Sequence, residues 1–188
     1  DYRNDAKMPM VFRSFVMNLA MQLAPLDPEV SNSLFSIYLK SMHEDSFGCG
    51  YALTEMMKND LMRYDFDAVD FNLNKLSAYD DRFRDLHFTG NLIEARSLFS
   101  QGKQEEAMNH LEKMIVDFRD LDYNYPKIFA MQAEFFFAMN QDEPFKKLYE
   151  TMVKKYPEAK TQELIYLKSL WGFYNTIMGN TDYGISQL

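Results

Sequence analysis

Small and turn-forming residues recur at one fixed spacing in the second half of the chain. Ala95, Gly102 and Ala107 are separated by seven and then five residues. The same two intervals recur further along, first at Ala133, Asn140 and Phe145 and then at Gly172, Gly179 and Gly184. From each set to the next the interval is 38 and then 39 residues. A period of this length predicts an internal repeat.

Each set has the residue types that a helical hairpin requires. A small side chain at the first position lets one helix approach its neighbours closely. The middle position is Gly or Asn, which accept the left-handed backbone conformation that ends a helix sharply. The pattern therefore predicts that Gly102, Asn140 and Gly179 each end a first helix, and that a second helix folds back on it.

Apolar residues in the first half also recur near the helical period of 3.6, in blocks separated by short breaks. The predicted helices cover residues 10–23, a segment beginning at Pro28, residues 51–62 and residues 68–76. The stretch HEDSFGCG, between the second and third of these, is interpreted as a break. The sequence has no Asn-Gly turn and no sustained alternation of β-branched residues, so strands are not expected. The prediction is an all-α fold.

We therefore predict one helical-repeat domain over residues 1–188. It is expected to be a right-handed stack of about five antiparallel helical hairpins, the last one truncated. Residues 1–85 would form less regular hairpins and residues 86–188 the regular repeats. The chain begins at Asp1 without a methionine and ends in a helix-like segment, DYGISQL. For this reason we expect it to be a piece of a longer protein.

The repeats of residues 88–188 resemble the tetratricopeptide repeat family. The family's small residue, turn glycine and Ala-x3-Phe pair correspond to Ala95, Gly102, Ala107 and Leu111 in one unit. Pro157 in KKYP corresponds to the proline that closes a repeat of the family. The intervals here are longer than the family's 34 residues. The resemblance implies an α-solenoid whose first helices line a concave groove for a peptide or a partner helix.

Composition limits the partners that such a protein can bind. The formal net charge is −8, whereas nucleic acids and anionic membrane surfaces require clustered Lys and Arg. The apolar run at residues 8–23 contains Arg13, Asn18 and Gln22, which suit an amphipathic helix rather than a membrane span or a signal peptide. Cys49 is the single cysteine and fits a reducing compartment. We expect a protein or peptide partner, no nucleic acid, no membrane insertion and a cytoplasmic location.

Residues that could catalyse a reaction or bind a metal are sparse. The three histidines lie far apart and in no metal-binding motif. The densest candidate, His43, Glu44, Asp45 and Cys49, could ligate a metal, but a polar loop with the cysteine against the core is favoured. We therefore expect no enzyme, no cofactor and no tightly bound metal.

The expected binding surface is the groove lined by the first helices of the repeats. The resemblance places there Leu92, Arg96, Phe99, Lys127, Glu134, Phe137, Tyr166 and Phe173, together with Ala130, Ser169 and Ile177. A leading unit would add Leu53, Met57 and Leu61. Each phenylalanine could instead belong to the core between hairpins, and both interpretations stay open. The expected function is a constitutive adaptor; the alternative is a sensory or regulatory domain of a larger signalling or transcription-regulating protein.

Overall fold

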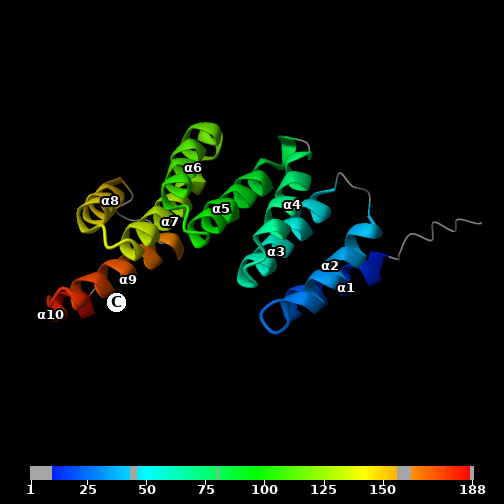
Figure 1. Ribbon diagram of the computed structural model, residues 1–188, viewed down its shortest axis with the longest axis horizontal. Helices are drawn as coiled ribbons and strands as arrows, with labels where there is room; N and C mark the ends of the chain where they lie inside the picture. Colours follow the sequence, from blue (N-terminus) through cyan, green and yellow to red (C-terminus); the bar gives the residue numbers. More distant parts are fainter. Residues whose placement is uncertain (1–9, 43–45, 80, 156–161, 187–188) are drawn as a thin grey trace, which may run out of the picture. The chain divides into compact units, whose positions relative to one another are not determined.

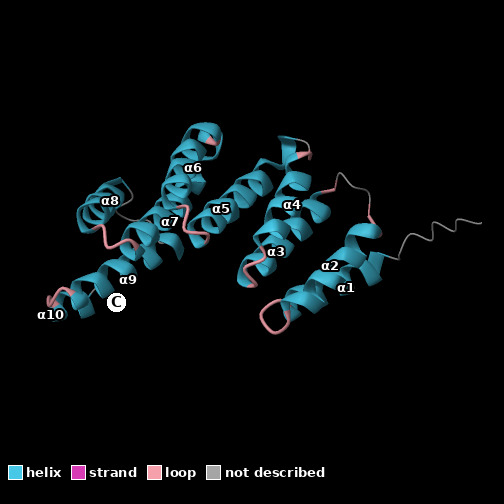
Figure 2. Ribbon diagram, viewed as in Figure 1, coloured by secondary structure: helices cyan, strands magenta, loops and turns pink. Residues whose placement is uncertain are grey.

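The computed structural model of the chain describes residues 10–42, 46–79, 81–155 and 162–186. Throughout these residues the regular structure is helical and no strand is formed, which confirms the predicted all-α fold (Figure 2). The chain divides into two compact units, residues 1–107 and residues 108–188. A single domain over residues 1–188 stays a prediction.

The helices follow one another with short connections (Figure 1). The first unit contains α1 (Met10–Leu23), α2 (Pro28–Lys40), α3 (Phe47–Met62), α4 (Phe66–Ser77), the short 3-10 helix η1 (Asp81–Phe83) and α5 (Arg84–Ser100). Helix α6 (Gln104–Asp117) crosses the boundary between the units. The second unit contains the 3-10 helix η2 (Arg119–Asn124), α7 (Tyr125–Ala138), α8 (Asp142–Lys155), α9 (Gln162–Ile177) and α10 (Thr181–Ser186).

Consecutive helices of the first unit pack in pairs. Helix α1 packs along α2 and α3 packs along α4, while α2 also contacts α3 (Figure 1). Helix α5 packs against both α3 and α4. Two groups of buried apolar side chains fill these contacts: Val16, Ala20, Phe35, Tyr38 and Ala52 in one, and Leu53, Met57, Val69, Leu76, Leu86 and Ile93 in the other.

The second unit has the same arrangement of pairs. Helix α7 packs against α8, α9 packs against α10, and α7 also contacts α9. The buried core of this unit consists of Ala133, Phe145, Tyr149, Met152, Leu167 and Tyr174. Trp171 packs against it, with its ring stacked on Tyr149 at 4.4 Å between centroids.

The predicted helix ends at Gly102, Asn140 and Gly179 are confirmed. These residues have φ angles of 80°, 56° and 86°, and each follows the last turn of a helix. A fourth residue, Tyr64, has a φ of 58° after α3, which the sequence analysis did not anticipate. Tyr64 precedes Gly102 by 38 residues, so the interval found in the second half extends into the first.

All four of these turns have the same hydrogen bonds. At the first, the backbone N–H of Asp65 donates to the carbonyl of Asp60 at 2.9 Å, and that of Tyr64 donates to the carbonyl of Leu61 at 3.1 Å. The corresponding bonds at the other three turns measure between 2.9 and 3.2 Å. This pair of bonds satisfies carbonyls that a helix end would otherwise leave without a partner, and it is known as the Schellman motif.

Burial follows the same interval. Seven residues before each turn residue stands a buried residue: Met57, Ala95, Ala133 and Gly172. Five residues after it stands another: Val69, Ala107, Phe145 and Gly184. The positions predicted to be small are therefore buried, but Met57 and Phe145 show that the space there also admits large side chains.

The predicted break at HEDSFGCG is wrong for its second half, because α3 begins there at Phe47. The hydroxyl of Ser46 accepts a hydrogen bond from the backbone N–H of Cys49 at 3.2 Å and caps the helix. Gly50 lies inside this helix, and the space beside it is too small for a side chain as packed. An added Cβ would lie 2.6 Å from Cδ1 of Leu86 on α5. The glycine thus allows a close contact between two helices rather than a loop.

Candidate protein-binding surface

Two of the predicted groove residues meet in the second unit. Phe137 on α7 and Phe173 on α9 have ring centroids 6.0 Å apart. Phe137 is half-buried and also contacts the core residue Phe145, at 5.9 Å between centroids. Phe173 is 51% exposed. One ring thus anchors the pair in the core and the other presents an aromatic surface to solvent.

The exposed aromatic ring belongs to a longer apolar face of α9. Tyr166 is 44% exposed and Ile177 is 61% exposed. Residues 166, 173 and 177 are spaced seven and four apart, so they lie on one side of the helix. Large apolar side chains that are exposed together on one helix face are typical of a surface that binds another molecule.

Two charged groove residues lie on α7. Lys127 is exposed, and Glu134 is half-buried. They stand ten and three residues before Phe137, which places all three on the same side of the helix. The predicted groove positions of the second unit therefore combine an aromatic pair with one charge of each sign.

The remaining predicted groove residues lie on α5 in the first unit. Leu92, Arg96 and Phe99 are all half-buried, and their spacing of four and three residues places them on one helix face.

The leading set of groove residues is wrong at two of its three positions. Leu53 and Met57 are buried in the core of the first unit, and only Leu61 is partly exposed. The reason is the unanticipated turn at Tyr64, which places Met57 at the position of Ala95, where the helix faces its own core.

A buried polar network joins the first four helices, and the sequence analysis missed it. The two carboxylate oxygens of Asp60 accept N–H groups from the side chains of Asn32 on α2, at 2.6 Å, and Asn72 on α4, at 3.0 Å. Asn59 donates to the side-chain oxygens of Ser31, at 2.9 Å, and Asn32, at 2.8 Å. Ser31 in turn donates to the carbonyl of Ala20 on α1, at 2.8 Å.

Asp60 is the charged member of this network and is only 3% exposed. Burial raises the pKa of its carboxyl group, and the nearby charge of Asp65 raises it further. The N–H groups of Asn72 and Asn32 and the charge of Arg63 lower the pKa, but the net effect is a raised pKa, with burial as the largest cause. The one available signal was polar residues among apolar positions of α3, and sequence alone does not show which partners they meet.

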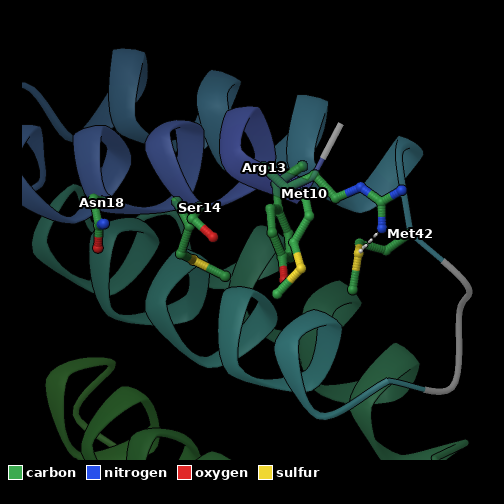
Figure 3. A pocket seen from close by; sticks show the side chains of 7 residues that line it. Met10, Arg13, Ser14, Asn18 and Met42 are labelled. Atoms are coloured by element: carbon green, nitrogen blue, oxygen red, sulfur yellow. Dashed lines mark hydrogen bonds between the residues drawn. The ribbon is translucent and has the colours of Figure 1, made fainter. Parts of the chain in front are cut away.

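A pocket of about 490 Å³ lies between α1 and α2 (Figure 3). Its lining consists of Met10, Arg13, Ser14, Met17, Asn18, Tyr38 and Met42. The guanidinium of Arg13 points toward Met42 and donates to its sulfur at 3.2 Å. The pocket is thus lined largely by thioether and polar groups, and it contains none of the predicted groove residues.

In the part of the chain that the structure describes, no three His, Cys, Asp or Glu side chains come together in a way that could hold a metal ion. Cys49 is buried in α3. His43, Glu44 and Asp45 lie outside the described residues. Among the described helices, none combines the length and apolar character that crossing a bilayer demands.

Comparison of the chain with protein-family models, with curated proteins and with solved structures found no match.

Proposed function

We propose that this chain is a non-catalytic protein–protein interaction module. In this proposal its helix pairs form an α-solenoid of the tetratricopeptide type, and the first helices of the pairs carry the binding face of each unit: α5 in the first unit and α7 and α9 in the second. A peptide or a partner helix binds against Phe137, Tyr166 and Phe173 of the second unit, with Lys127 and Glu134 selecting its polarity. In the first unit the binding residues are Arg96 and Phe99. The protein acts as an adaptor, and no cofactor takes part.

The recurring turns support the stacked arrangement. Tyr64, Gly102, Asn140 and Gly179 end their helices with the same pair of hydrogen bonds and at nearly constant intervals. Repeat proteins bury a continuous core by placing equivalent pairs next to one another. The burial of equivalent residues before and after every turn is what such stacking requires.

The observation that carries the proposal is the exposure of Phe173 beside Phe137. An aromatic side chain of this size costs free energy when it stays in contact with water, and it returns that free energy when a partner covers it. Aromatic and arginine anchors supply most of the binding energy in protein interfaces. Phe173 is supported by Phe137 and is therefore held in place before a partner arrives.

Site-specific cross-linking would test this placement. A photoreactive phenylalanine analogue at position 173 should cross-link a protein partner. The same analogue at position 116 should not, although Val116 on α6 is also exposed, at 68%. The two positions differ in their surroundings rather than in their access to solvent. The comparison therefore distinguishes a specific binding face from nonspecific cross-linking at any exposed position.

The affinity of the partner identified in this way is then measured. Phe173→Ala and Arg96→Ala should each weaken binding tenfold or more, a loss of about 1.4 kcal/mol, whereas Val116→Ala should leave it unchanged. Normal binding by both folded groove variants would overturn the proposal. Retention of the partner only in the presence of a small effector would favour the sensory or regulatory alternative.

A further inference from the structure

The Asp60 network contains a carboxyl group whose charge the fold does not favour. A carboxylate loses its hydrating water molecules when it is buried, and two neutral amide donors replace only part of that stabilisation. Asp60 receives such donors from Asn32 and Asn72 at 2.6 and 3.0 Å. The neutral, protonated acid would avoid this cost and keep the same shape.

The position of Asp60 makes the packing of the first helices sensitive to that charge. The residue lies on α3, and its two partners lie on α2 and α4. Asn32 also accepts from Asn59, which contacts Ser31, and Ser31 contacts the carbonyl of Ala20. Any change in how Asp60 is held therefore acts on contacts among α1, α2, α3 and α4.

We propose that Asp60 is a proton-linked lock on the first helix pairs of this protein. Uptake of a proton by its carboxyl group strengthens the packing of α2, α3 and α4, and release of the proton weakens it. The lock belongs to the first unit and the face on α7 and α9 belongs to the second, so the lock does not depend on the proposed binding function.

The direction of this pH effect follows from the groups that face Asp60. Helices α2 and α4 face it with the amides of Asn32 and Asn72. The charged groups that act on it are Arg63, at the end of α3, and Asp65, the cap of α4. With burial the largest influence, the pKa of Asp60 is raised in the folded unit.

A raised pKa means that the folded unit binds the proton more tightly than an opened one does. The stabilisation is therefore complete below the ordinary pKa of an aspartate, and it is lost as the pH rises through the higher pKa of the folded unit. This is the opposite of the trend for carboxylates in salt bridges, which lose their stabilising effect on acidification.

Hydrogen exchange of the 188-residue chain, followed peptide by peptide between about pH 4 and about pH 8, tests the proposal. Asp60→Asn resembles the protonated acid in shape and in having a donor, and serves as the reference. After correction for intrinsic exchange, protection of α2 and α3 in the native protein should fall relative to this variant by up to about tenfold per pH unit, within the window between the two pKa values. Equal pH dependence in the two proteins would overturn the lock.

Two charge variants keep the test decisive if Asp60→Asn does not fold. The side chains of Arg63 and Asp65 are exposed, and asparagine preserves the cap at position 65. Arg63→Gln should move the loss of protection to higher pH, because it removes the charge that lowers the pKa of Asp60. Asp65→Asn should move it to lower pH. A purely structural role for Asp60 predicts no movement in either variant, and that result would also overturn the lock.

Discussion

Asn72 on α4 donates its side-chain N–H to Asp60 on α3 across 3.0 Å, and both side chains are buried. The bond lies next to the turn at Tyr64, where the carbonyl of Asp60 accepts the backbone N–H of Asp65. One residue thus holds the following helix twice, once through its backbone and once through its side chain.

Asn72→Ala should destabilise the first unit by about 1–3 kcal/mol, because it leaves a buried carboxylate with one partner fewer. The matched control is Asn74→Ala on the same helix, whose side chain is exposed and whose loss should cost less than about 0.5 kcal/mol. Urea unfolding followed by circular dichroism, together with hydrogen exchange of α3 and α4, measures the difference. Equal stability of the two variants would contradict the prediction.

Phe145→Ala should destabilise the second unit by about 3–5 kcal/mol, since this side chain is fully buried. Its ring contacts Phe137, Trp171 and Tyr174. Phe173→Ala should cost less than half as much, because its ring is half in solvent. Trp171 is the only tryptophan of the chain and lies in this unit, so its fluorescence during urea unfolding reports on the unit directly. A larger loss for Phe173→Ala would mean that Phe173 belongs to the core and that the groove is placed wrongly.

Gly184→Ala should be more harmful than Gly179→Ala. An added Cβ at Gly184 would lie 2.6 Å from the carbonyl oxygen of Gly172 and 2.8 Å from the backbone nitrogen of Thr176. Backbone atoms cannot turn aside as a side chain can, so we expect a loss of about 2–3 kcal/mol or detachment of α10. At Gly179 no atom lies within 4 Å of the added Cβ, and only the φ of 86° opposes it, at a cost of about 1 kcal/mol. Tryptophan fluorescence again measures both, and the reverse order would contradict the expected close contact of α9 and α10.

Tyr64→Gly should stabilise the first unit by up to about 1 kcal/mol, since a tyrosine with a φ of 58° pays a cost that glycine avoids. The gain is reduced by loss of the ring contact with Phe66, whose centroid lies 6.2 Å away. Asn140→Gly should gain less, because asparagine tolerates the left-handed conformation. The two melting temperatures, each compared with the native protein, test this order. A loss of stability in Tyr64→Gly would show that the ring contact outweighs the backbone strain.

The sequence could predict the turns at positions where the residue type itself favours a positive φ. Gly102, Asn140 and Gly179 are of types that adopt a positive φ at low cost, and all three do so. Tyr64 adopts the same conformation for reasons of packing and hydrogen bonding that no local preference records. The missed turn then displaced the assignment of Met57, so a single local error placed a core residue in the predicted groove.

Glycines were read correctly at the turns and incorrectly within α3. In both places the residue lacks a side chain for a physical reason, but at Gly50 the reason is the approach of Leu86 from a distant part of the chain. The Asp60 network could not be predicted for the same reason, because its partners come from helices that are separated in sequence. Contacts between distant residues, rather than local preferences, mark the limit of what could be predicted.

The nearly constant interval between turns also determines where this chain could change in length. Equivalent residues keep an interval of 38 up to Met152, which follows Met114, whereas Leu167 follows Ile128 by 39. The one additional residue therefore lies between Met152 and Leu167, the region where α8 ends and α9 begins. A residue inserted inside a helix would rotate everything after it by about 100° and expose the buried side. Epitope tags and fluorescent labels therefore belong in the connections between pairs, where an extra residue leaves the phase of the following helix intact.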